Sequence, residues 1–235
     1  MILFIPLVII ASFLGKVTGG NIIYDACRIW ADIWFFLIGV FYRNIYEAPY
    51  DTSRQYIFVS NHISYLDIPV IMKAVRKQHF RILGKAELGA IPVFGFIFKQ
   101  AAVSVDRKNP ENRAKSVIIL KSIIKRKISV FICPEGTFNE THKPLKDFYE
   151  GAFKIAIETQ TPIKPILFLD TYDRLNYKSI FSLSPGRSRA VFLEETNTAG
   201  LSLNDVSSLK EKVYKQMEDA LIRYNATWIK PSKSL

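Results

Sequence analysis

The chain has 235 residues, 49% of them hydrophobic, and this length suits one domain with a sizeable core plus an appendage. Such a composition excludes a disordered chain and makes membrane contact an expectation. The formal net charge of +11 suits either nucleic acid or anionic lipid as a partner. Because no helix-turn-helix, zinc-finger or aromatic–basic RNA-binding pattern is present, we expect no nucleic-acid partner. Cys27 and Cys133 lie far apart, and neither His79 nor His142 has a metal-binding side chain at ligand spacing. We therefore expect no disulfide framework and no metal site.

The first 14 residues form an uncharged apolar segment. It is shorter than the roughly 20 residues that cross a bilayer. A signal peptide would begin with basic residues and end in a small-residue cleavage site, but no Lys or Arg precedes residue 16. We therefore favour a retained membrane anchor, with a cleaved signal peptide as the alternative.

The next segment is a predicted helix with one narrow polar stripe. The stripe consists of four side chains at intervals of four, three and four residues: Asn21, Asp25, Arg28 and Asp32. The residues between them are apolar or aromatic. Three charges make a spanning helix costly, whereas a helix lying in the interface, with its tryptophans at headgroup depth, is easier. A buried core helix is the alternative. We predict a helical hairpin, its segments separated by Gly19-Gly20, that dips into one leaflet.

After Pro49 the sequence alternates short apolar runs with amphipathic helices. Strands are predicted over residues 56–60, 80–84, 102–106, 128–133 and 163–168. Helices are predicted to begin near Pro110 and to cover residues 148–159 and 209–224. This alternation implies an α/β fold with a mixed, largely parallel sheet flanked by helices.

The most informative segment is Asn-His-Ile-Ser-Tyr-Leu-Asp at residues 61–67, directly after the first predicted strand. His62 and Asp67 are five residues apart, so they do not share a helix face and meet only across a turn. Asp67 followed by Pro69 fits a helix start. A carboxylate beside an imidazole selects its tautomer and stabilises the imidazolium, so His62 can act as a general base. The alternative is a surface histidine beside a helix cap.

Three further segments follow in order: residues 95–107 (GFIFKQAAVSVDR), 133–137 (CPEGT) and 161–166 (TPIKPI). With residues 61–67 they resemble the four ordered blocks of the 1-acylglycerol-3-phosphate acyltransferases, within the glycerolipid acyltransferase superfamily. The resemblance covers about residues 55–170.

That resemblance implies an enzyme that moves a fatty acyl chain from acyl-CoA or acyl carrier protein to the free hydroxyl of a lysophospholipid. The favoured acceptor is 1-acylglycerol 3-phosphate, which gives phosphatidic acid. It implies His62 as the base, Asp67 as its orienter, direct attack on the thioester, and no cofactor besides the acyl donor as co-substrate. The absence of a Gly-x-Ser-x-Gly elbow from the sequence agrees with direct attack.

The resemblance also implies residues that bind the acceptor. It gives Glu135, Gly136 and Thr137 a role in holding it. Many members continue this block with an arginine, whereas Phe138 and Asn139 follow here, which puts the acceptor headgroup in doubt.

Phosphate recognition falls to Arg107, because the family uses the matching arginine for the acceptor's phosphate and a guanidinium fork suits that group. The alternative is that Arg107 pairs with a nearby acid such as Asp106 or Glu111. Lys85, at the end of the second predicted strand, is a second candidate phosphate contact.

We expect a membrane-associated helical hairpin over residues 1–45 and an acyltransferase catalytic domain over residues 46–235. The protein is expected at the cytoplasmic face of the inner membrane, in contact with anionic lipids. The alternatives are acylation of another lyso-lipid, such as a lyso-ornithine lipid or another lysophospholipid, and a catalytically silent lipid-binding membrane protein.

Overall fold

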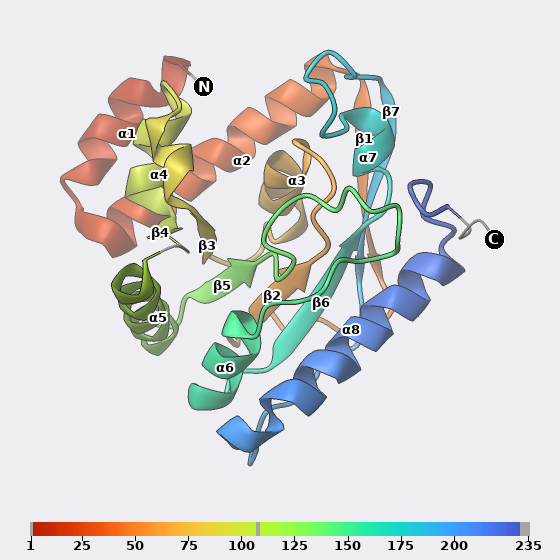
Figure 1. Cartoon of the computed structure of the whole chain (residues 1–235). Coiled ribbons are helices and arrows are strands. Elements are labelled where there is room, and N and C mark those ends of the chain that lie inside the picture. Colours follow the sequence, from red (N-terminus) through yellow and green to blue (C-terminus); the bar gives the residue numbers. More distant parts are fainter. Residues whose placement is uncertain (1, 107–108, 231–235) are drawn as a thin grey trace.

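The computed structural model describes residues 2–106 and 109–230, which form an α/β fold around one sheet (Figure 1). The strands are β1 Val40–Tyr46, β2 Ile57–Ser60, β3 Phe80–Lys85, β4 Val103–Val105, β5 Ser129–Ile132, β6 Ile163–Phe168 and β7 Gly186–Phe192. The helices are α1 Ile5–Ser12, α2 Gly20–Leu37, α3 Asp67–Ala74, α4 Phe94–Ala101, α5 Pro110–Lys125, α6 Gly151–Glu158, α7 Thr171–Arg174 and α8 Val206–Arg223.

Within the described ranges the sheet has seven strands in the order β1-β7-β6-β2-β5-β3-β4. The five central and far-edge strands β6, β2, β5, β3 and β4 run parallel to one another. Strand β7 is antiparallel to β6, and β1 is parallel to β7. The predicted mixed, largely parallel sheet is therefore confirmed, and the carboxyl ends of the five parallel strands share one edge.

Two strands were missed by the sequence reasoning, namely β1 and β7. The first of them spans Val40–Tyr46, so the expected division between residues 45 and 46 falls inside a strand of the sheet. The hairpin is thus continuous with the sheet through the strand that follows it.

Alternating residues of the strands build a core on each side of the sheet. Val59 and Val130 pack with the side chains of α5, α6 and α8. Phe58 and Phe131 point the other way and pack with α2 and α3. Because both faces are covered, the central strands β2 and β5 are apolar except for a serine at one end of each, as in other buried parallel sheets.

Helices α1 and α2 form the predicted hairpin, but the chain reverses before the glycine pair (Figure 1). Gly15 has a φ of +78° and begins a π-helical turn that ends at Gly19. A Cβ on Gly19 would lie 1.9 Å from the carbonyl oxygen of Ala11, and one on Gly20 would lie 2.5 Å from the guanidinium of Arg81. The two glycines are therefore required by close packing rather than by the turn.

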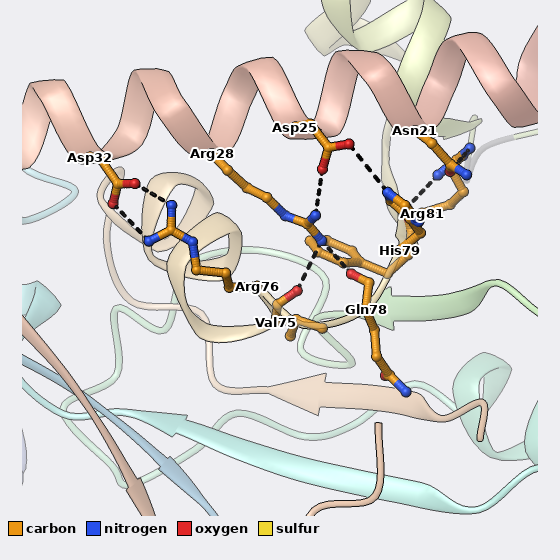
Figure 2. A network of polar contacts seen from close by, with 10 residues as sticks. Asn21, Asp25, Arg28, Asp32, Val75, Arg76, Gln78, His79 and Arg81 are labelled. Atoms are coloured by element: carbon orange, nitrogen blue, oxygen red, sulfur yellow. Dashed lines mark hydrogen bonds and ion pairs between the residues drawn. The ribbon is translucent and has the colours of Figure 1, made fainter. Parts of the chain in front are cut away.

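The polar stripe of α2 faces the body of the protein (Figure 2). The Arg28 guanidinium pairs with Asp25 Oδ1 at 2.6 Å and donates to the carbonyl oxygens of Val75, at 3.1 Å, and Gln78. Those carbonyls follow the last turn of α3, where helix carbonyls have no partner inside the helix. Arg28 thus caps the carboxyl end of α3 and places a cation at the negative end of its dipole.

The ends of the stripe are anchored in the same way. Asp32 accepts hydrogen bonds from Lys73 and Arg76, which lie in and just after α3. Asn21 Oδ1 accepts from Arg81 Nη2 at 2.9 Å, in β3. The docked side of α2 therefore carries this stripe beside buried apolar residues such as Tyr24 and Phe35, and the outward side is apolar. Its exposed residues are Ile29, Ile33, Phe36 and Leu37.

Candidate active site

The candidate site lies at the edge shared by the carboxyl ends of the parallel strands, the position where open α/β sheets bind ligands. Strand β2 ends at Ser60 and leads directly to His62, and β5 ends at Ile132 and leads to Glu135. Because β2 and β5 are adjacent and in register, these two segments emerge side by side. The hydroxyl of Ser60 and the thiol of Cys133 lie 3.5 Å apart across that junction.

His62 and Asp67 meet across the turn that their spacing requires. Nδ1 of His62 lies 2.8 Å from Oδ2 of Asp67, the first residue of α3. The same oxygen accepts from the amides of Ile63, at 2.8 Å, and Ser64, at 3.0 Å. An ionised carboxylate only accepts, so the ring carries its proton on Nδ1 and leaves Nε2 free to accept one. The Asp67 side chain is fully buried, whereas that of His62 is 22% exposed.

Two polar side chains fix the turn to other elements. The amide group of Asn61 bonds both backbone groups of Phe168, with Nδ2 to O at 3.0 Å and N to Oδ1 at 2.8 Å. Ser64 Oγ accepts from the amide of Leu66 at 2.9 Å and donates to the carbonyl oxygen of Leu175. Ser64 is therefore a residue that shapes the turn, whereas the role of Asn61 was not anticipated.

Glu135 is buried beneath the histidine. Its Oε1 accepts from the His62 amide and its Oε2 from the Lys146 amide, each at 2.8 Å. Burial raises the pKa of Glu135 to about 8, although these two amides partly offset the effect. The carboxyl group therefore joins two segments of backbone and holds the histidine in place. Gly136 follows with a φ of +75°, a conformation that favours glycine and closes the turn onto the Cys133 carbonyl at 3.0 Å.

Thr137 is the exposed residue of this block, and its hydroxyl lies 2.5 Å from Nζ of Lys146. Lys85 is partly buried and ends β3, which adjoins β5 at the same edge of the sheet. Arg107 lies outside the described residues, so its role stays a prediction.

An aromatic wall borders the histidine and was not predicted. The Phe138 ring lies 4.4 Å from the His62 ring, centroid to centroid, and contacts Tyr65 edge-on at 5.0 Å. Tyr177 also stacks on Phe138, with 6.2 Å between the ring centroids. The only available signal was that an aromatic residue directly follows the Pro-Glu-Gly-Thr turn. This wall makes one side of the imidazole apolar.

A buried carboxylate that orients a partly exposed histidine, at the edge of a mostly parallel sheet, is an arrangement for general-base chemistry. Residues 41–169 match the model of the acyltransferase family, and the chain belongs to that family.

Curated relatives carry more specific names. The chain is 32% identical over 174 residues to 1-acyl-sn-glycerol-3-phosphate acyltransferase alpha of Mus musculus, a match that covers 70% of this chain and 58% of the relative. It is 28% identical over 177 residues to the beta form of Homo sapiens, covering 74% of this chain and 63% of the relative. The chain thus spans about three fifths of the length of these two relatives.

Among solved structures, the chain is similar to the 1-acyl-sn-glycerophosphate acyltransferase of Thermotoga maritima, with a TM-score of 0.72 and 22% identity. That match covers 97% of this chain and 91% of the other. At this identity the likeness shows the fold.

Proposed function

We propose that the protein transfers a fatty acyl chain from a thioester carrier, acyl-CoA or acyl carrier protein, to the free hydroxyl of a lysophospholipid. The observation that carries the proposal is the 2.8 Å contact between Nδ1 of His62 and the buried carboxylate of Asp67, which leaves Nε2 as the nitrogen that can accept a proton. Family membership supports the reaction type, because the family model is that of acyltransferases.

In the proposed reaction, Nε2 of His62 takes the proton from the acceptor hydroxyl as its oxygen attacks the thioester carbonyl. The new carbon–oxygen bond forms, the carbon–sulfur bond breaks, and the proton passes from the imidazolium to the leaving thiolate. Asp67 stabilises the imidazolium between these two transfers. Glu135 keeps the backbone of His62 in place throughout.

The favoured acceptor is 1-acylglycerol 3-phosphate, and the favoured product phosphatidic acid. The names of the curated relatives support this choice. Arg107 is proposed to bind the phosphate, with Lys85 as a second cation at the same edge of the sheet. Gly136 and Thr137 border the space in which the acceptor would lie.

The lyso-lipid would be met at a membrane, and we propose that the hairpin of α1 and α2 contacts it through its apolar side. The exposed apolar residues of α1 and the following turn include Leu7, Ile10, Phe13 and Leu14. With the net charge of +11, this surface suits an anionic leaflet, at the cytoplasmic face of the inner membrane. Among the described residues, no helix is long and apolar enough to cross a bilayer.

The test is a reaction panel with protein purified in detergent. Acyl-CoA and acylated acyl carrier protein, each with a radiolabelled acyl chain, are offered in turn with lysophosphatidic acid and with other lyso-lipids, lyso-ornithine lipid included. The lipid products are then separated. Labelled phosphatidic acid that disappears with His62→Ala supports the proposal. A different labelled lipid would reassign the acceptor, and no product with any pair would favour a silent lipid-binding protein.

A further inference from the structure

The loop between α7 and β7, residues 175–185, holds apolar side chains outward. Ile180 is 65% and Phe181 is 90% exposed, and Leu183 is also exposed. Burying such a side chain is worth about 1.5–3 kcal/mol, so two neighbours left in water are a sizeable cost. The proposed reaction does not use them.

Serine side chains of the same loop form hydrogen bonds within it and fix its shape. Ser179 Oγ accepts from the amide of Phe181 at 3.1 Å, and Ser182 Oγ donates to the carbonyl of Ser179 at 2.6 Å. At the base, the amide of Ser184 donates to the carbonyl of Arg174 at 2.8 Å. The loop is therefore an ordered Ω-type turn whose tip is held away from the protein.

The loop also borders the catalytic histidine. The carbonyl of Leu175, where the loop starts, accepts the hydroxyl of Ser64 in the histidine turn. Tyr177 stacks on Phe138, which in turn packs on His62. Phe181 at the exposed tip is four residues from Tyr177 in the aromatic wall. A displacement of the tip would therefore move the wall of the site.

The base of the loop lies at the end of the membrane hairpin. The amide of Gly186 donates to the carbonyl of Gly39 at 2.9 Å, two residues after α2. Phe36, in the last turn of α2, is 85% exposed, and Leu37 beside it is also exposed. Figure 1 shows the α7–β7 loop next to this end of α2, whereas α1 lies at the other end. Exposed apolar groups thus lie beyond both ends of α2, those of α1 at one end and those of the α7–β7 loop at the other.

We propose that residues 178–183 form a second membrane contact, in which Ile180 and Phe181 enter the acyl-chain boundary of an anionic bilayer. Lys178, inside the loop, and Arg187, at the start of β7, are exposed cations that suit lipid headgroups. A bilayer would bury the apolar tip and pair these cations with its anionic headgroups at the same time. The inference rests on the proposed function in that the acceptor is a bilayer lipid. The mouth of the site would then be held at the interface from two sides.

A fluorescent probe tests the contact directly. Phe181→Cys is labelled with an environment-sensitive dye in a Cys27→Ser, Cys133→Ser background, and vesicles of phosphatidylglycerol and phosphatidylcholine are added with and without spin-labelled lipid. Leu203→Cys is the matched control, because Leu203 is 56% exposed and lies just before α8, whose first turn is far from the α7–β7 loop in Figure 1. Quenching at residue 181 but not at 203 is expected.

Equal quenching at both positions would overturn the proposal. The proposal would also be overturned if the probe at residue 181 were shielded from water before lipid is added and the protein had twice the mass of one chain. A second copy of the chain would then cover the loop.

A functional comparison uses the double change Ile180→Ser, Phe181→Ser, with Leu203→Ser as control. Vesicle binding should weaken by about ten-fold or more in the double variant, and turnover of vesicle-borne acceptor should fall with it. Turnover of a short-chain soluble acceptor and the thermal midpoint should stay near the wild-type values. Unchanged vesicle binding overturns the proposal. If the wild type acylates no lyso-lipid, the proposed function fails, while probe quenching still decides the membrane contact.

Discussion

Replacing Asp67 by asparagine separates the charge of this residue from its shape. One oxygen of the new side chain can still accept from the amides of Ile63 and Ser64, so the turn should persist. The amide nitrogen would then stand where Oδ1 lies, which is buried and has no hydrogen-bond partner among the described residues. An unpaired buried donor costs about 1–3 kcal/mol, so a modest fall in thermal midpoint is expected.

The catalytic cost is expected to be larger. Oδ2 lies 2.8 Å from Nδ1 of His62. Once the ring takes the acceptor's proton, charge centres about 4 Å apart attract by about 4 kcal/mol at an effective dielectric constant of about 20. Asp67→Asn loses this attraction in the transition state, which corresponds to a fall of about 10³-fold in rate. The ground state, with a neutral ring, loses far less.

The assay follows release of free thiol from acyl-CoA with saturating lysophosphatidic acid, in detergent, with product lipid as a second readout. His62→Ala and the double variant complete a mutant cycle, because groups that act as a unit are not additive. Asp67→Asn should cost little more once His62 is gone. A folded Asp67→Asn variant with more than about a tenth of wild-type turnover would refute the charge argument. An equal loss in both backgrounds would show that Asp67 acts independently of the histidine.

Three further predictions follow from other groups. Because the pKa of Glu135 is raised to about 8 from 4.5, the folded state binds the extra proton and this group makes the free energy of unfolding fall as pH rises from about 4.5 to 8. Melting curves of Glu135→Gln should lack that part of the slope, and identical slopes would contradict the burial argument. Arg28→Met should lower the free energy of unfolding by about 1–3 kcal/mol, since two carbonyls after α3 lose their donor. Arg43→Met, at an exposed position, should not lower it. Equal denaturation midpoints of the two variants would contradict the capping role of Arg28. Arg107→Lys should raise the KM for the acceptor more than that for the thioester, and an unchanged acceptor KM would leave Arg107 a structural role.

Contacts close in sequence were predictable, and contacts set by strand order were not. His62 and Asp67 are five residues apart, so a turn alone brings them together. Strand β6 matches its predicted bounds because its apolar run begins right after Pro162. The bonds between Asn61 and Phe168 join residues 107 apart, and they exist because β6 is the neighbour of β2. No local pattern in the sequence specifies that adjacency.

The two missed strands have a different explanation. β7 reads Gly-Arg-Ser-Arg-Ala-Val-Phe, and only its second half is apolar. One of its arginines is held by the fold, since Arg189 forms two 2.8 Å hydrogen bonds to Asp170 after β6. β1 alternates exposed and less exposed positions because it is an edge strand paired only with β7 within the described residues. Tertiary contacts, rather than composition, therefore place both strands in the sheet.

The stripe on α2 shows why amphipathicity indicates two faces without saying which one is inside. An interfacial helix and a docked helix can have the same periodicity. In this chain the polar stripe lies on the docked side, next to buried apolar residues of α2, because Arg28 donates to carbonyls at the end of α3 and Asp32 accepts from two cations beside it. A second set of apolar residues, Ile29, Ile33 and Phe36, is thereby left outward. This seam of paired charges also fixes how α2 is rotated about its axis, because any other rotation would separate the charges from their partners. The seam therefore determines which residues of α2 would meet lipid in the proposed membrane contact, and Arg28 helps to set that orientation.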